Sequence, residues 1–174
     1  MTARATHDVD PDEPMPAGES GDDLIELLFF AYRDFVGDPD RILAQYGFGR
    51  AHHRVLHFVD RYPGLTIAEL LDILRITKQS LNRVLKDLIG QDYITQKTGT
   101  SDRRQRLLFC TSAGTALAGD LIRVQSRRVA RALANLEAGR AMPPSAESFL
   151  FGMIEPEERA AVRRLMARRV RSAA

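Results

Sequence analysis

The residues of this chain most suited to chemistry lie on one face of a short amphipathic stretch, residues 77–88. Apolar side chains recur there at helical spacing: Leu81, Val84, Leu85 and Leu88. Around these positions stand seven side chains that can donate hydrogen bonds, three of them cationic: Thr77, Lys78, Gln79, Ser80, Asn82, Arg83 and Lys86. Such donors suit phosphate oxygens and the acceptor-rich edges of guanine and adenine. The stretch indicates a nucleic-acid contact, with an ordinary solvated helix surface as the alternative.

The local charge favours the first interpretation. Between Arg75 and Arg106, eight basic residues stand against three acidic ones, a net charge of +5 in a chain whose formal total is +2. A basic patch concentrated on one group of elements is the electrostatic footprint of nucleic-acid binding.

Two helices and a hairpin are predicted to position these residues. Thr66 and Glu69 have the spacing of a capping box for a first helix, and Thr77 can cap a second one. The β-favouring residues 93–98 and 106–111, separated by a turn-like stretch, predict a two-stranded hairpin. This layout is that of a winged helix-turn-helix. It offers a helix to the DNA major groove and a hairpin to the minor groove or the backbone.

Residues 50–114 resemble the MarR family of bacterial transcription regulators. The resemblance rests on the helix that starts Thr77-Lys-Gln-Ser, the wing sequence Asp102-Arg103-Arg104, and the helix start at Thr111-Ser-Ala-Gly. It implies a mainly α fold with a small β-hairpin wing: a winged helix-turn-helix with flanking dimerisation helices. The sequence departs from the family pattern at Arg75, where the family has a turn glycine, and at an apparent insertion near residues 139–150. A non-glycine residue held at positive φ costs roughly 1 kcal/mol, so this turn is expected to differ slightly.

The resemblance also assigns roles within the expected DNA-binding surface. The residues expected to read or anchor the major groove are Lys78, Gln79, Ser80, Asn82 and Arg83. Lys86 is expected to contact phosphate. Arg103, or else Arg104, is expected to reach the minor groove from the wing, with Asp102 orienting it.

Four segments are predicted along the chain. Residues 1–22 form an acidic, disordered tail, since the first 23 residues hold seven acidic residues and one basic residue. Residues 23–48 form a dimerisation region whose helix, Leu24 to Val36, is apolar on more sides than one monomer face needs. Residues 49–111 form the DNA-binding lobe. Residues 112–174 hold a long linking helix and a C-terminal dimerisation helix that begins near Pro156. The arginines between residues 123 and 131 are interpreted as a solvated or ion-paired face.

The family resemblance suggests a small-ligand crevice near Phe30, Arg33, His53 and His57, suited to anionic or phenolic aromatic compounds. His53 and His57 stand one helical turn apart and could share a metal, but further ligands are lacking, so histidines in a packing seam are the preferred interpretation. Cys110 is interpreted as a small buried hydrophobe, because redox sensing needs an accessible thiol of low pKa.

Other classes of function are disfavoured. The sequence holds no phosphate-binding glycine loop, nucleophile–base pairing or metal-hydrolase spacing, so no enzyme activity, cofactor or metal is expected. No apolar run is long enough to span a bilayer, and the first residues lack the features of a signal peptide, so a cytoplasmic protein is expected. The expected partners are double-stranded DNA, a second copy of the chain and a small effector. The alternative is a winged-helix module for protein contact or for non-specific, architectural DNA binding.

Overall fold

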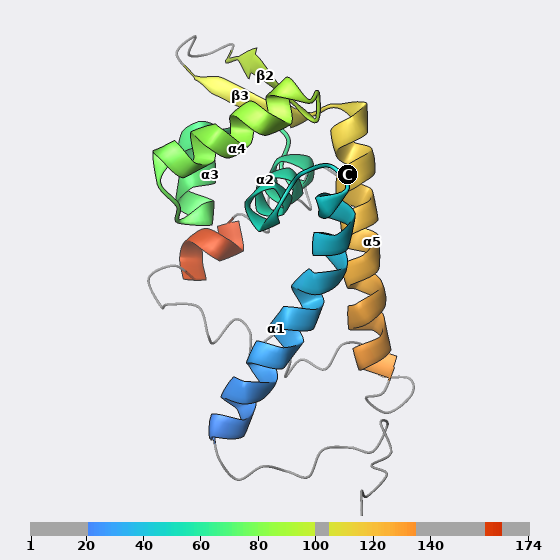
Figure 1. Ribbon diagram of the computed structural model, residues 1–174. Helices are drawn as coiled ribbons and strands as arrows, with labels where there is room; N and C mark the ends of the chain where they lie inside the picture. The colour runs from blue at the N-terminus through green and yellow to red at the C-terminus, as the bar shows by residue number, and fades with distance from the viewer. Residues whose placement is uncertain (1–20, 100–104, 135–158, 165–174) are drawn as a thin grey trace, which may run out of the picture.

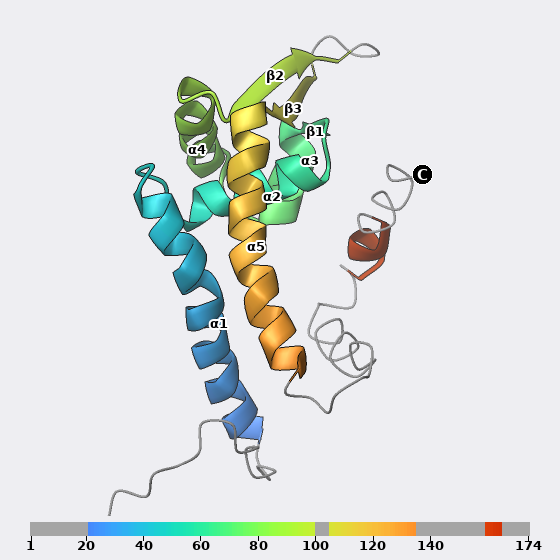
Figure 2. The ribbon, with the colours of Figure 1, turned by 90° about the vertical axis from the view of Figure 1, so that its right-hand side faces the viewer.

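The computed structural model describes residues 21–99, 105–134 and 159–164. Two long helices, α1 (Gly21–Ala44) and α5 (Ser112–Ala134), lie side by side below a lobe of shorter elements (Figure 1). The lobe contains α2 (Arg50–Arg61), β1 (Leu65–Thr66), α3 (Ile67–Leu74), α4 (Lys78–Gly90), β2 (Ile94–Thr98) and β3 (Arg106–Cys110). A view turned by 90° shows α1 and α5 still adjacent, with opposite chain directions (Figure 2). The predicted fold class, mainly α with a β-hairpin wing, is confirmed.

The sheet has one more strand than the predicted hairpin. Its order is β1-β3-β2, and both pairings are antiparallel. In β1, Leu65 pairs with Leu108, and the backbone N–H of Gly64 donates to the Leu108 carbonyl at 2.8 Å. A strand of two residues is too short to show alternation in the sequence, which is why pattern analysis misses it. The third strand ties the wing to the start of the helix pair.

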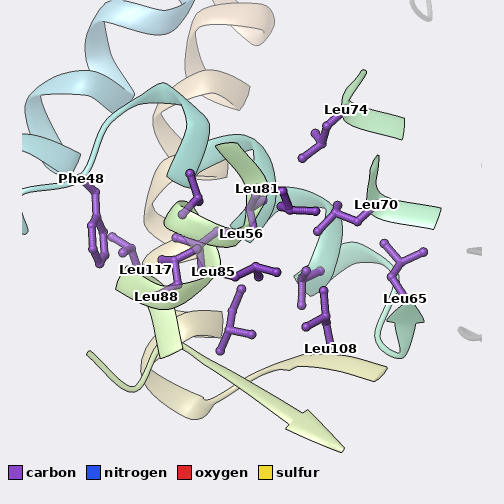
Figure 3. Packing of buried hydrophobic residues seen from close by; sticks show 14 of the residues in the cluster. Phe48, Leu56, Leu65, Leu70, Leu74, Leu81, Leu85, Leu88, Leu108 and Leu117 are labelled. Carbon is purple, nitrogen blue, oxygen red and sulfur yellow. The ribbon is translucent and has the colours of Figure 1, made fainter. Parts of the chain in front are cut away.

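The core of the lobe is built around the apolar sides of the two predicted helices. Figure 3 shows side chains from α2, α3, α4 and the sheet meeting there, including Leu70, Leu81 and Leu108. All four stripe residues of α4 are buried: Leu81, Val84, Leu85 and Leu88. In α3, Leu70 and Leu74 are buried, whereas Ile67 and Leu71 lie only partly buried at the edge of the core. The packing therefore fixes which side of α4 faces outward.

Helix α1 is longer than predicted. The predicted helix covered Leu24 to Val36, whereas α1 runs from Gly21 to Ala44 and passes through Pro39. A proline has no N–H group, so the carbonyl of Phe35 loses its partner within the helix. Gln125 of α5 takes that place, since its Nε2 donates to the Phe35 carbonyl at 3.4 Å. The ring of Pro39 is fully buried. A contact from a distant helix thus allows a continuation that local rules disfavour.

An ion pair also joins α5 to α1. Arg128 of α5 contacts Asp38 of α1, with Nη2 2.6 Å from Oδ2. This hydrogen bond is the main cause of a lowered pKa for the Asp38 carboxyl. Arg123 pairs with Asp120 on α5 itself. The interpretation of the residue 123–131 arginines as an ion-paired face is confirmed for these two.

Several predicted segments lie outside the described residues. These are the acidic tail up to residue 20, the apparent insertion at 139–150, and most of the predicted last helix, of which residues 159–164 are helical. Residues 21 and 22, the end of the predicted tail, belong to α1. Within the described ranges, no helix combines the length and apolarity that crossing a bilayer requires.

Candidate nucleic-acid interface

The two helices of the interface begin at the predicted caps. Thr66 Oγ1 accepts from the N–H of Glu69 at 3.2 Å, and Glu69 Oε2 accepts from the N–H of Thr66 at 2.8 Å, which completes the capping box of α3. Thr77 Oγ1 likewise accepts from the N–H of Ser80 at 3.2 Å and caps α4. The Thr77 hydroxyl donates to Ser80 Oγ at 2.9 Å. The hydroxyl proton of Ser80 therefore stays available to an outside acceptor.

The turn between the helices depends on Arg75. Its φ of 52° and ψ of 46° place it in the left-handed region that a glycine usually occupies. Its N–H donates to the Leu71 carbonyl at 2.9 Å, and Arg54 of α2 donates to the Leu74 carbonyl at 2.8 Å. These bonds satisfy two of the last four carbonyls of α3, those of Leu71 and Leu74. Arg75 therefore adopts, without glycine, the left-handed conformation that glycine usually supplies at the end of a helix.

The outward face of α4 carries the predicted hydrogen-bond donors. All are exposed: Thr77, Lys78, Gln79, Ser80, Asn82, Arg83 and Lys86. They form one surface because the opposite side of the helix is buried in the core. The helix is 13 residues long, so it extends about 20 Å at 1.5 Å per residue. The diameter of an α-helix suits the major groove of DNA, which is about 12 Å wide.

The wing has two further cations, which belong to the predicted basic patch but were given no role of their own. Lys97 of β2 lies with Nζ 4.9 Å from the centre of the Phe109 ring. Arg106 of β3 donates from Nη1 to Thr98 Oγ1 at 2.6 Å. The predicted minor-groove residues, Asp102, Arg103 and Arg104, lie outside the described residues. The described wing thus brings positive charge to the end of the strands that lies next to the hairpin tip.

Comparison with known proteins identifies this architecture. A family model described as MarR family matches residues 46–105. The HTH-type transcriptional regulator PetP of Rhodobacter capsulatus is 44% identical over 135 residues, which cover 78% of this chain and 80% of that protein. The chain belongs to the MarR family of DNA-binding transcription regulators.

Solved structures of MarR-family proteins share the fold. RV1404 from Mycobacterium tuberculosis aligns with a TM-score of 0.58 at 20% identity, covering 88% of this chain and 94% of that one. A mutant of S. aureus MepR, bound to an oligodeoxyribonucleotide, aligns at 0.51 and 15% identity, covering 87% and 98%. The M. tuberculosis MarR family protein RV2887, in complex with p-aminosalicylic acid, aligns at 0.50 and 26% identity, covering 72% and 92%.

This MarR-family chain also has an open cleft of about 500 Å³ between its long helices and the lobe. Its walls come from α1, α2 and α5: Phe35, His57, Arg61, Ile122, Gln125, Ser126, Val129 and Ala130. Of the four residues predicted for an effector site, His57 lines this cleft. Arg33 instead lies over the Phe30 ring, 5.1 Å from its centre, and pairs with Asp34. His53 is 9% exposed and lies inside the structure.

Two of the three histidines of α2, His53 and His57, are held toward their neutral form. Burial is the main cause of the lowered pKa of His57, and the positive charge of Arg61 adds to it. The pKa of His53 is lowered by burial and then by His57, against a hydrogen bond with Gln125 that raises it. Among the residues the structure describes, no group of three or more histidines, cysteines or carboxylates is arranged to hold a metal ion. The histidines thus belong to a packing seam beside the cleft.

Cys110 packs against the core at the end of β3. Burial raises the pKa of its thiol to about 12. A thiolate is the reactive form of cysteine, so this environment disfavours redox chemistry. Cys110 was interpreted as a buried hydrophobe, and the structure places it only partly buried, at the edge of the core.

Proposed function

We propose that the chain acts as a homodimeric, sequence-specific regulator on a near-palindromic operator. The observation that carries the proposal is the division of α4 into a buried apolar side and an exposed side of hydrogen-bond donors. In this proposal Lys78, Gln79, Asn82 and Arg83 read or anchor the major groove. Ser80 and Thr77 support the same contact, and Lys86 binds phosphate. Arg103 or Arg104, oriented by Asp102, enters the minor groove.

The dimer is supported by apolar side chains on α1 that no part of the described chain covers. Phe29 is 71% exposed and Tyr32 58%, and Ile25 and Phe30 are about half exposed. Large exposed apolar side chains gathered on one helix mark an interaction surface. In the proposal, residues 23–48 and 112–174 pair two copies, and residues 49–111 bind DNA. Two recognition helices then contact half-sites about 34 Å apart, in the cytoplasm where the chromosome lies.

The effector is proposed to be a small anionic or phenolic aromatic compound that binds in the cleft. Arg61 and His57 offer a positive charge and a hydrogen-bonding ring, while Phe35, Ile122 and Val129 offer apolar walls. The p-aminosalicylic acid bound by RV2887, a protein 26% identical to this chain, has this chemistry. Binding there is expected to change the separation of the two recognition helices.

Sequencing the genomic fragments that the purified protein retains tests the proposal. Sequence-specific binding by a dimer predicts a shared near-palindrome whose half-sites are about one helical turn apart. For such a site, the logarithm of the binding constant should fall with the logarithm of salt concentration by about 0.9 per phosphate contacted. A flat profile would instead support an architectural DNA binder, and an absence of salt-dependent binding would support a module for protein contact.

A further inference from the structure

One residue of α4 is unexpected on a helix that faces DNA. Asp87 is the helix's acidic residue, and it stands beside Lys86 and one turn after Arg83. Its side chain is 44% exposed. A carboxylate held close to phosphate groups is repelled by them. Asp87 therefore either weakens DNA binding or has a role that offsets this repulsion.

A histidine from α2 binds the Asp87 carboxylate. His52 Nε2 lies 3.2 Å from Asp87 Oδ2. The other ring nitrogen, Nδ1, accepts a hydrogen bond from the N–H of Gly49 at 3.1 Å. In the neutral ring Nδ1 is then the acceptor, so the proton is on Nε2 and is donated to Asp87. The two contacts fix both the tautomer and the orientation of His52.

The ring of His52 is also held by aromatic packing. It stacks on Phe48, with ring centres 4.7 Å apart and planes at 15°. Phe48 in turn meets the ring of Tyr93 edge-on at 5.2 Å, just before β2 begins. Only 15% of the His52 side chain is exposed. His52 is thus fixed to the start of α2, to α4 and, through Phe48 and Tyr93, to the base of the wing.

We infer that His52 and Asp87 are positioning residues for DNA recognition. Their hydrogen bond fixes the angle of α4 against α2, so that the donors of α4 and the wing meet the same DNA site. This inference rests on the proposed role of α4 as the reading helix. The benefit is specific to a matched DNA sequence, because only base contacts need the exact helix angle. The cost of a negative charge near phosphate applies to any DNA.

Two substitutions at Asp87 separate these effects, because they change the charge equally. Asp87→Asn keeps an oxygen that accepts from His52 Nε2, whereas Asp87→Ala leaves no acceptor. The measurement is the affinity of full-length protein for an operator from the genomic selection and for a scrambled duplex of equal length. On the operator, we expect Asp87→Ala to bind on the order of tenfold more weakly than Asp87→Asn, the effect of one hydrogen bond to a positioned group. On the scrambled duplex, both variants should bind slightly more tightly than the native protein.

Further variants and folding measurements serve as controls for the comparison of the two Asp87 variants. Asp72→Ala removes an exposed carboxylate from the neighbouring helix α3 and reports the effect of charge alone. Retained binding to the scrambled duplex and thermal melting show that each variant is folded. Equal operator affinity for Asp87→Ala and Asp87→Asn, whether raised or lowered, would overturn the inference. Arg83→Ala tests the reading helix itself: if it leaves operator binding unchanged, the proposed function fails, independently of the result at Asp87.

Discussion

At the residue scale, the exposed cations of α4 are expected to differ in what they recognise. Arg83→Ala should weaken operator binding by about 1–3 kcal/mol if the guanidinium reads a base, and it should relax the sequence preference at one position. Lys86→Ala should weaken binding to all sequences alike and lower the salt slope by about 1, as loss of a phosphate contact does. Fluorescence anisotropy over a salt series measures both. Equal effects of the two variants on sequence preference would contradict the assigned roles.

Cys110 is expected to be unreactive in the native protein. It is partly buried, and the pKa of its thiol is raised to about 12, so the thiolate is scarce near neutral pH. A chromogenic disulfide reagent should label the native protein slowly and the denatured protein at once. Fast labelling of the folded protein would mean that Cys110 is accessible and would reopen a sensing role.

At the element scale, the start of α5 is closely packed against the base of the wing. A side-chain carbon added at Gly114 would overlap the carbonyl oxygen of Tyr93, whereas one added at Gly119 would meet open space. Gly114→Ala should therefore lower the free energy of unfolding by about 1–3 kcal/mol, the usual cost of overpacking. Gly119→Ala, in the same helix, should raise it by roughly 0.5–1 kcal/mol. Denaturant unfolding of the two variants gives the comparison, and destabilisation by both would contradict it.

His53 and His57 of α2, whose pKa values are lowered in the folded chain, predict a pH dependence of stability. Above the ordinary histidine pKa of 6.5, the folded and unfolded chains are both neutral at these positions, and the histidines contribute no pH dependence. Below it, the unfolded chain takes up protons that the folded chain resists, so the free energy of unfolding falls as the pH decreases. Asp34 and Asp38 also have lowered pKa values, but their effect lies below their ordinary value of 3.8.

Denaturant unfolding between pH 7.5 and 5, values that bracket the ordinary histidine pKa, measures this slope. Replacing His53 and His57 with glutamine should flatten it. The control is a variant at His52, whose ring binds Asp87 outside the cleft. Its slope of stability with pH is compared with that of the double variant. If the double variant keeps the full slope, other groups cause it.

At the scale of the whole molecule, α1 is expected to hold two copies together. Phe29→Ser should shift the sedimentation equilibrium toward monomer, because it removes the most exposed large apolar side chain of the described residues from the proposed interface. Ile89→Ser, at the end of α4, changes a similarly apolar exposed residue outside that interface and should leave the equilibrium unchanged. A native protein that stays monomeric at micromolar concentration would argue against the proposed dimer.

The sequence predicted the DNA-binding lobe well because its signals are local. Capping residues at Thr66 and Thr77 and the apolar stripe ending at Leu88 report contacts within one helix or along one face. The continuation of α1 past Pro39 was missed because the group that makes it possible, the amide of Gln125, comes from a helix far along the chain. The effector residues were only partly located for the same reason. His57 lines the cleft, but most of the other walls of the cleft come from α1 and α5. The sequence does not show how these helices lie against α2.

By itself, the sequence determined which residues face the core and which face outward in the helix pair, the family, and a concentration of positive charge that favours DNA. The facing of the residues and the charge follow from periodicity and composition, which do not depend on distant contacts, whereas the family was indicated by the resemblance of short motifs such as Asp102-Arg103-Arg104. Only the tertiary structure decided how Arg75 is accommodated, that a third strand supports the wing, and that His52 binds the lone carboxylate of α4. Each of these depends on hydrogen bonds between segments separated in the chain, and such bonds leave no pattern in the local sequence.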